Sequence, residues 1–374
     1  DVPHVTPVDG QVIELGEAEV VALHTPGHTP DHFAYYVSDR HDADQAPALF
    51  SGDVMFVGDL GRPELLGGRM AEALAPQLYR TVWEKLAALP GHTILYPGHG
   101  AGSACGKNLS SKPTSTLAEE FATSPALQIR DEQAFVEFMT SDQPRVSPHF
   151  LEMVQTNRAG APAPQSFEAI PELTADDIRT DLREGDTLVL DARSSDAYSR
   201  GHLPGTVYMG VNPGMPTWMG WLVNVGQPVV ALVESRQQAE DLRRWMVRVG
   251  FDHLDGYHVF DPGAWEGELR TLATVPGDTF DPATVEGQFI DVRTPAEVAR
   301  GTLPGARSIP LCELPGRMDE LDKSRPLTVF CQAGYRGTIA GSLLENAGFD
   351  QVTNVAGGYA AVTKGREIAC AASA

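Results

Sequence analysis

The sequence predicts an α/β protein in which one layered α/β domain is followed by two copies of a smaller α/β module with a parallel sheet. Three observations support this prediction. In the first 150 residues, short apolar segments alternate with loops and with one helical segment. A stretch rich in Ala, Pro and Gly at 157–173 then marks a domain boundary. Beyond it, residues 188–205 are repeated at 288–305, an offset of 100 residues.

The first domain is predicted from the order of its apolar segments. "QVIELG" and "EVVALH" alternate in polarity around a Gly-containing turn, so we expect a hairpin over 11–24. "HFAYYV" and "PALFSG" are two further short strands, and residues 70–89 follow a helical period. "HTILYPGHG" is a strand that leads into a Gly-rich loop. Because polar residues of interest stand at several strand ends, we expect a layered domain with a site at its loop tips.

The repeat predicts two modules of the same topology. Asp191 and Asp291 match at the offset of 100, and "PVVALVES" matches "PLTVFCQA" further on at an offset of 98. Each copy has the order strand, helix, strand, helix, strand, which is typical of a parallel sheet. The domain boundaries expected from these features are 1–160, 161–275 and 276–374.

The net charge argues against nucleic-acid and anionic-membrane partners, and the cysteine pattern indicates a redox compartment. The chain carries 50 acidic and 28 basic residues, a net charge of -22, so we expect no nucleic-acid partner and no anionic membrane partner. The sequence contains no run of 18 apolar residues, so no membrane-spanning helix is predicted. The cysteines show no C-x-x-C spacing and no disulfide framework, which fits a reducing cytoplasm. They are Cys105, Cys312, Cys331 and Cys370.

The most specific motif is "LTVFCQAGYRGTIAG". An apolar strand over 327–330 ends at Cys331, Arg336 follows five residues later, and a helix is expected to continue to about residue 347. A cysteine in this position faces the backbone N–H groups of 332–336 and the N-terminus of the helix, which favour a thiolate and bind an anion. Gly334 permits the tight backbone curve. The structural alternative is a buried free cysteine at the end of a core strand.

Residues 277–366, including "DVRTPAEVARGTLPGA", resemble the rhodanese family of sulfurtransferases, with Thr302 where the family has a histidine. The resemblance implies that Cys331 carries the transferred sulfur as a persulfide held by the backbone of 332–336, and that Arg336 is a further catalytic residue. A loop one residue longer would be typical of dual-specificity phosphatases, which are a minor alternative. The residues implied to hold the sulfur and its donor are Gln332, Ala333, Gly334 and Tyr335.

The first copy of the module lacks this cysteine. Val233 occupies the position of Cys331, and Glu234 follows it. We therefore predict a rhodanese-like domain that is not catalytic. Its "PTWMGW" stretch, residues 216–221, is expected to pack against a neighbouring domain, with an interaction patch as the alternative.

Three loops of the first domain suggest a metal site. His28 in "TPGHT", Asp53 in "FSGD" and His99 in "YPGHG" each follow a predicted strand. Imidazole and carboxylate groups at converging loop tips suit a divalent transition metal. His24 and His32 are expected to be packing or orienting residues rather than ligands.

These loops resemble the metallo-β-lactamase superfamily, and "FVGDLGRPEL" with "GHGAGSACGKNL" makes them similar to persulfide dioxygenases fused to rhodanese domains. The superfamily's H-x-H-x-D-H motif does not occur in the sequence. The expected fold is therefore an N-terminally truncated metallo-β-lactamase αββα domain followed by two rhodanese-like α/β domains with parallel sheets.

The resemblance implies one Fe(2+) in the intact protein, held by His28, Asp53 and a histidine absent from this chain. His99 would lie near the iron without binding it. Arg62 would anchor the carboxylate or phosphate of a thiol carrier, and Cys105 would take part in sulfur handling. Cys312 and Cys370 are expected to be structural or incidental.

The implied function is sulfide detoxification: O2 oxidises a low-molecular-weight thiol persulfide to sulfite, and sulfur transfer through Cys331 gives thiosulfate. The sequence leaves the carrier (glutathione, coenzyme A or another thiol) and a homo-oligomer open. One alternative is a thioester hydrolase similar to glyoxalase II, with two Zn(2+), Asp53 bridging them and His99 as a ligand. Another is a sulfur carrier that uses Cys331 and has a non-catalytic first domain.

Overall fold

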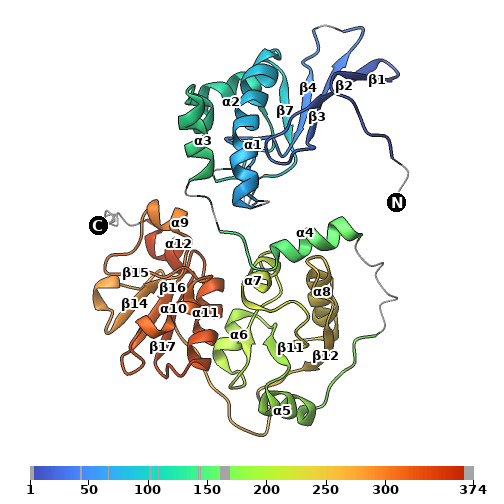
Figure 1. Ribbon diagram of the computed structural model, residues 1–374. Coiled ribbons are helices and arrows are strands. Elements are labelled where there is room, and N and C mark those ends of the chain that lie inside the picture. Colours follow the sequence, from blue (N-terminus) through green and yellow to red (C-terminus); the bar gives the residue numbers. More distant parts are fainter. Residues whose placement is uncertain are drawn as a thin grey trace. The chain divides into compact units, whose positions relative to one another are not determined.

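The computed structural model describes residues 4–42, 44–65, 67–100, 103, 105–107, 109–141, 143, 145–160 and 169–365. Cys370 and part of the expected linker lie outside the described residues. The chain forms two compact units, Asp1–Val146 and Ser147–Ala374, which Figure 1 colours from blue to red along the sequence. The first unit thus ends before residue 160, the boundary expected from composition. Just past that end, the ring of His149 lies within the second unit, 5.6 Å from the ring of Phe251.

The first unit contains a six-stranded sheet in the order β1-β2-β3-β4-β7-β8. The predicted hairpin is confirmed, because β1 and β2 pair antiparallel around Gly16, whose φ is 64°. Strands β4 and β7 pair in parallel, so the loops that follow them leave the same edge of the sheet. The strands are β1 (Gln11–Leu15), β2 (Ala18–His24), β3 (Phe33–Asp39), β4 (Ala48–Gly52), β7 (Ile94–Pro97) and β8 (Ser115–Thr116), with a separate small ribbon of β5 (Met55–Phe56) and β6 (Asp59–Leu60).

The helix predicted over 70–89 is observed in three different forms. The segment α1 (Gly68–Arg80) changes at Thr81 into a π-helical turn, η1 (Thr81–Lys85), and ends in a 3-10 turn, η2 (Leu86–Ala88). The widened turn directs two side chains at the segment that precedes His28. Thr81 Oγ1 donates to the carbonyl of Pro26 at 2.7 Å, and Lys85 Nζ donates to that of His24 at 2.7 Å. A π turn at such a place is typical of segments that support a functional site.

The two faces of the first sheet differ in what covers them. One face carries fully buried Leu49 and Leu95 and packs on α1, α2 (Leu117–Thr123) and α3 (Glu132–Thr140), as Figure 1 shows. The other face carries an exposed aromatic row. Its side chains stand opposite one another on adjacent strands and are 37%, 50% and 39% exposed. They are Tyr35, Phe50 and Tyr96.

The second unit contains the two modules of the repeat, each with a fully parallel sheet as predicted. The first sheet has the strand order β10-β9-β11-β12. The second, read from its opposite edge, has the matching order β15-β14-β16-β17 followed by one extra strand, β13. The first module has β9 (Leu188–Asp191), β10 (Val207–Tyr208), β11 (Val229–Val233) and β12 (Leu254–Val259). The second has β13 (Ala273–Pro276), β14 (Gln288–Asp291), β15 (Arg307–Ser308), β16 (Leu327–Phe330) and β17 (Val352–Ala356).

The repeat extends to buried hydrogen bonds. Arg193 donates to Asp191 at 2.6 Å and to the carbonyl of Gly201 at 2.7 Å. Arg293 makes the same pair of bonds in the second module, to Asp291 and to the carbonyl at position 301. The helices are α4 (Phe150–Ala159), α5 (Ala175–Glu184), α6 (Ser195–Arg200), α7 (Met215–Leu222), α8 (Arg236–Val247), α9 (Pro295–Ala299), α10 (Leu314–Arg317), α11 (Tyr335–Asn346) and α12 (Gly358–Thr363).

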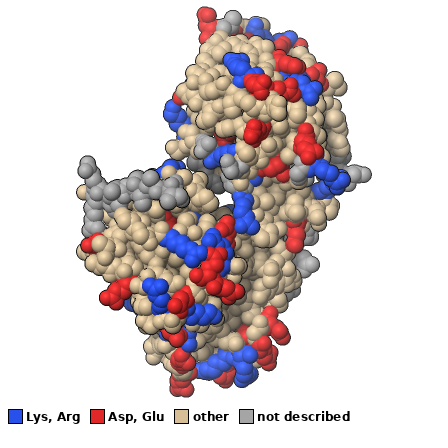
Figure 2. Space-filling model, turned by 60° about the vertical axis from the view of Figure 1, so that its left-hand side comes forward, with Lys and Arg blue, Asp and Glu red and all other residues tan. Residues whose placement is uncertain are grey.

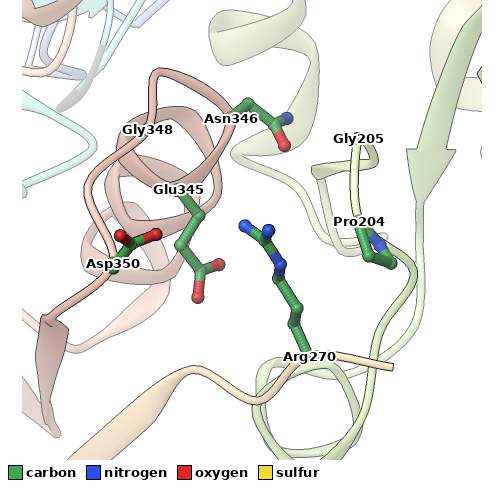
Figure 3. A pocket seen from close by; sticks show the side chains of 7 residues that line it. All are labelled: Pro204, Gly205, Arg270, Glu345, Asn346, Gly348 and Asp350. Atoms are coloured by element: carbon green, nitrogen blue, oxygen red, sulfur yellow. The ribbon is translucent and has the colours of Figure 1, made fainter. Parts of the chain in front are cut away.

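The two modules pack against each other. Trp218 and Leu222 of α7 lie against the hydrophobic cores of both modules, which agrees with the packing role expected for 216–221. Beyond the C-terminal end of α11, an open cavity of about 450 Å³ lies between the two modules. Figure 3 shows the side chain of Arg270 extending between those of Glu345 and Pro204 at this cavity.

The surface in Figure 2 carries acidic and basic side chains interspersed among uncharged ones. Among the described residues, no helix combines the length and the apolar character needed to span a bilayer.

Candidate functional site

Cys331 occupies the predicted position between a core strand and a helix. Strand β16 ends at Phe330, and Cys331 is 1% exposed at the entrance to α11. Its Sγ accepts a hydrogen bond from the backbone N–H of Gly334 at 3.1 Å. Gly334 has φ of +98°, and a Cβ there would lie 3.1 Å from the backbone nitrogen of Gly357. The loop therefore depends on glycine both for its conformation and for its close packing.

Backbone and side-chain bonds hold this loop from two sides. The N–H of Tyr359 donates to the carbonyl of Cys331 at 2.7 Å. The carbonyl of Gly334 accepts from Thr338 Oγ1 at 3.2 Å and from Asn354 Nδ2 at 3.3 Å. Thr338 and Asn354 were not singled out from the sequence. The available signal for Asn354 was a polar residue inside the apolar strand "VTNVA", which in a buried position needs hydrogen-bond partners.

Arg336 is bound to a carboxylate of the neighbouring helix. Its Nη1 and Nη2 donate to the two oxygens of Glu297 on α9 at 2.7 and 2.6 Å. Burial raises the pKa of Glu297, but the hydrogen bonds and charge of Arg336, with the bonds from Thr294, outweigh burial and lower this pKa to about 2. The pair thus stays ionised, and a direct role of Arg336 in catalysis remains a prediction.

Two other side chains of this loop, those of Gln332 and Tyr335, form hydrogen bonds within the protein. Gln332 Oε1 accepts from Arg293 Nη1 at 3.3 Å, and the hydroxyl of Tyr335 donates to the carbonyl of Gly210 at 3.0 Å. Burial raises the pKa of Tyr335 well above its ordinary value, so the phenol stays protonated. Ala333 is the exposed residue of the loop. The contribution of this segment to anion binding would therefore come from its backbone amides.

The equivalent loop of the first module is closed by its own side chains. Fully buried Val233 stands at the cysteine position, and Ser235 Oγ accepts from the N–H of Gln238 at 3.3 Å. Gln238 Oε1 in turn accepts from the N–H of Glu234 at 2.7 Å. Two of the amides that could bind an anion, those of Glu234 and Gln238, are thus satisfied internally, and the Glu234 carboxylate would repel an anion.

The three predicted metal loops meet in the first unit. His28 Nε2 lies 3.5 Å from Asp53 Oδ2, and His99 Nδ1 lies 2.7 Å from Asp53 Oδ1. Cys105 joins them: a ligand atom from each of His28, Asp53 and Cys105 lies within 4.8 Å of the other two. The structure thus brings together residues that are up to 77 positions apart in the sequence, counted from His28 to Cys105.

The protonation of His28 suits a metal ligand. Its Nδ1 lies 2.9 Å from the carbonyl of Arg62, which can only accept, so Nδ1 carries the hydrogen and Nε2 presents a lone pair. Burial lowers the pKa of His28 more than the Asp53 charge and the carbonyl raise it, which keeps the imidazole neutral. A carbonyl that orients a ligating histidine is common around bound metals. The nitrogen, oxygen and sulfur donors present fit a divalent transition metal ion.

Two further residues fix the position of Asp53. His32 Nε2 accepts from the N–H of Asp53 at 3.0 Å, while its Nδ1 bonds to Thr25 Oγ1 at 2.8 Å. At Gly98, a Cβ would lie 2.6 Å from Asp53 Oδ1. His24, by contrast, bonds to the carbonyl of Pro30 at 3.0 Å. Both additional histidines thus support the loops, as orienting residues would.

Arg62 and Cys105 are linked through the backbone. The N–H of Arg62 donates to the carbonyl of Cys105 at 3.1 Å, and the Arg62 guanidinium, 4% exposed, bonds to Glu64 Oε1 at 2.6 Å. Burial raises the pKa of the Cys105 thiol, a bond to Ser103 opposes this, and the Asp53 charge adds to the rise. The guanidinium is held by a carboxylate, and its contact with a substrate remains a prediction.

Comparison with known proteins identifies both units. Residues 1–99 match the metallo-beta-lactamase superfamily, and residues 174–260 and 280–364 each match the rhodanese-like domain. A crystal structure of a metallo-beta-lactamase from Staphylococcus aureus subsp. aureus COL is 32% identical, with a TM-score of 0.58, over 67% of this chain and 70% of that one.

Curated relatives match the parts separately. A probable hydroxyacylglutathione hydrolase of Schizosaccharomyces pombe is 35% identical over 36% of this chain and 51% of its own length. A sulfurtransferase of Allochromatium vinosum is 39% identical over 20% of this chain and 68% of its own length. The chain spans about half or less of the first curated relatives that it matches, 51%, 40% and 31% of their lengths. The chain belongs to the metallo-β-lactamase superfamily through its first unit, and it carries two rhodanese-like domains behind that unit.

Proposed function

We propose that this protein is a persulfide dioxygenase joined to a sulfurtransferase, with Cys331 as the residue that carries sulfur. The observation that carries the proposal is the Gly334 N–H bond to Cys331 Sγ at the start of α11. A thiolate held by backbone amides at a helix N-terminus is both nucleophilic and close to an anion-binding site. The match of this module to the rhodanese-like domain supports the same chemistry.

In the transfer step, the Cys331 thiolate attacks the outer sulfur of a donor. With thiosulfate, the new S–S bond to Cys331 forms while the bond between the donor's two sulfurs breaks and sulfite leaves with the electron pair. The reverse reaction, in which sulfite attacks the outer sulfur on Cys331, yields thiosulfate and restores the thiolate. The amides of 332–335 would stabilise the anionic groups in both directions.

In the first unit, His28 and Asp53 would hold Fe(2+), and His99 would orient Asp53 through its 2.7 Å bond. A bound iron would supply the redox chemistry with O2. The overall reaction converts a thiol persulfide anion, O2 and water into the free thiol and hydrogen sulfite. The Cys105 thiol lies within 4.8 Å of the His28 and Asp53 ligand atoms, which supports a role for it in handling the sulfur of the persulfide.

A second candidate is a zinc-dependent thioester hydrolase. The curated relatives named hydroxyacylglutathione hydrolase favour it, at 35%, 30% and 38% identity. It would require Asp53 to bridge two Zn(2+) and His99 to be a ligand. His99 Nδ1 lies 2.7 Å from Asp53 Oδ1, so both side chains could also serve as ligands in this second candidate.

The transferase half is tested by thiosulfate:cyanide sulfur transfer. Wild-type protein and a Cys312→Ser control should transfer sulfur equally, whereas Cys331→Ser should lose the activity. Retained transfer in Cys331→Ser would overturn the assignment of the carrier.

The metal half is tested by metal analysis and oxygen uptake. After reconstitution, one iron per chain and O2 consumption with glutathione persulfide or coenzyme A persulfide would support the dioxygenase. Two zincs per chain and thioester hydrolysis would support the hydrolase. Sulfur transfer that survives chelation, without O2 uptake or hydrolysis, would leave only a sulfur carrier.

A further inference from the structure

Helix α11 presents one side to the cysteine-free first module. Five of its residues, spaced at intervals of three, four, three and one, contact that module, four of them through hydrogen bonds, and this spacing defines a single helix face. The bonds near the sulfur loop are the Tyr335 hydroxyl to the carbonyl of Gly210 at 3.0 Å and Thr338 Oγ1 to Ser195 Oγ.

The bonds of the distal half hold the other end of the helix. Ser342 Oγ accepts from the N–H of Tyr208 at 3.1 Å, and Asn346 Nδ2 donates to the carbonyl of Thr206 at 2.9 Å. Between them, Glu345 Oε2 lies 3.2 Å from His202 Nε2. The first module therefore contacts α11 along its whole length, from the end next to the Cys331 loop to the C-terminal end.

One of these contacts leads directly to the sulfur. Thr338 Oγ1 donates to the carbonyl of Gly334 at 3.2 Å, and the N–H of Gly334 donates to Cys331 Sγ at 3.1 Å. Since Thr338 uses its hydrogen on Gly334, the hydrogen between the two hydroxyls belongs to Ser195. The chain of bonds thus runs from Ser195 in one module to Cys331 in the other.

We propose that the first module positions the sulfur-carrying loop of the second, and that Ser195 is a positioning residue for Cys331. Ser195 fixes the rotamer of Thr338, and Thr338 fixes the peptide of Gly334, whose amide is directed at the sulfur. Asn354 Nδ2 also donates to Thr338 Oγ1 at 3.1 Å and to the carbonyl of Gly334 at 3.3 Å. Without Ser195, Thr338 Oγ1 accepts only the bond from Asn354, and the Gly334 peptide is held less firmly. This inference rests on the proposed function, because it concerns the same thiolate.

The chain offers controls that separate positioning from general packing. Ser199 lies one turn after Ser195 on the same short helix, and its hydroxyl has no hydrogen-bond partner in the structure. Asn346 belongs to the same inter-module contact but lies at the far end of α11 from Cys331. Ser199→Ala therefore controls for the substitution, and Asn346→Ala controls for weakened packing of the modules.

The experiment compares full-length wild type with Ser195→Ala, Thr338→Val, the double variant and the two controls. The first readout is the rate of alkylation of Cys331 by iodoacetamide, followed by peptide mass, with Cys312 as internal reference. The second is kcat and KM for thiosulfate. We expect each single variant to slow alkylation of Cys331 by about 2- to 10-fold, the effect of losing one hydrogen bond, with Cys312 unchanged. The double variant should be no slower than the slower single variant, because both break one chain.

Ser195→Thr, which keeps the hydroxyl, should restore the rate, and kcat should fall in Ser195→Ala more than KM rises. The proposal is overturned if Ser195→Ala matches Ser199→Ala, or if Asn346→Ala slows Cys331 as much as Ser195→Ala does. Absence of Cys331-dependent sulfur transfer in wild type would instead refute the proposed function. The alkylation rates would still decide the positioning role, since they require no sulfur donor.

Discussion

The carboxylate of Glu297 receives two hydrogen bonds from the guanidinium of Arg336, at 2.6 and 2.7 Å. The pair joins α9 to the first turn of the helix that follows the sulfur-carrying cysteine. Arg336 also lies beside the first module, with its guanidinium carbon 6.0 Å from the ring of Trp218. The arginine predicted to be catalytic is thus also a connection between three elements of the second unit.

This ion pair predicts a pH-dependent stability. Because the pKa of Glu297 in the folded protein is about 2, below its ordinary 4.5, the carboxylate stabilises the fold above pH 4.5. That contribution is lost as the pH falls toward 2 and is at most about 3 kcal/mol at neutral pH. Denaturant unfolding of wild type and Glu297→Gln should therefore differ at pH 7, and the difference should shrink as the pH falls from 4.5 toward 2. Glu240→Gln, at a half-buried pair with Arg243, serves as control, and a difference that persists unchanged to pH 3 would contradict the assignment.

A cysteine placed in the first module should not become a second carrier. Ser235 and Gln238 already occupy the local N–H donors, and the Glu234 carboxylate follows the substituted position. We expect Val233→Cys in a Cys331→Ser background to take up no sulfane sulfur from thiosulfate, measured by cyanolysis. Uptake near one equivalent per chain would show that the backbone N–H groups of this loop can leave Ser235 and Gln238 and bind an anion.

His32 should matter for metal binding although it is not a ligand. Loss of its bond to the N–H of Asp53 frees the loop that carries this carboxylate, so His32→Ala should weaken metal affinity by about 10- to 100-fold. His24→Ala, which removes only a bond to the carbonyl of Pro30, should have a much smaller effect. Competitive chelator titration of the reconstituted protein measures both. Equal losses in the two variants would contradict the separate role of His32.

The space beside Asp53 should tolerate no side chain. In Gly98→Ala the new Cβ would lie 2.6 Å from Asp53 Oδ1, so the carboxylate must move away from His28. Metal retained after reconstitution should fall at least about tenfold, as for other changes that reorient a ligand. Gly100→Ala, two residues on and with open space around it, should retain metal like wild type. If Gly98→Ala also keeps its metal, Asp53 is not held where the ligand argument requires.

Much of the fold could be predicted because its signals are local or repeated. The alternation of "QVIELG" and "EVVALH" gives the β1–β2 hairpin, and the offset of 100 residues gives two parallel sheets of matching order. The change of α1 into a π turn at Thr81 could not be predicted, because it depends on the carbonyl of Pro26. The exposure of Phe50 could not be predicted either, because one apolar residue in a strand does not reveal whether other elements cover that face of the sheet.

The residues of the candidate sites likewise fall into those that a sequence motif predicts and those that no motif predicts. His28 and Asp53 directly follow glycines, and Gly334 stands three residues after Cys331, so these short motifs made their loops visible in the sequence. Ser195 and Thr338 carry no motif. They lie 143 positions apart in the sequence and meet only because the two modules pack together. Contacts between distant segments leave no periodic signal, so the residues proposed to orient Cys331 were missed, whereas Cys331 itself stood out by its motif.

The absence of a cysteine from the loop of the first module bears on how much sulfur the proposed transferase could store. Val233 stands where the second module has Cys331, so the duplicated scaffold offers one sulfur-accepting thiol at this position and not two. Under the proposed function, the two modules together would hold a single sulfur atom, and a second atom could be loaded only after an acceptor had removed the first.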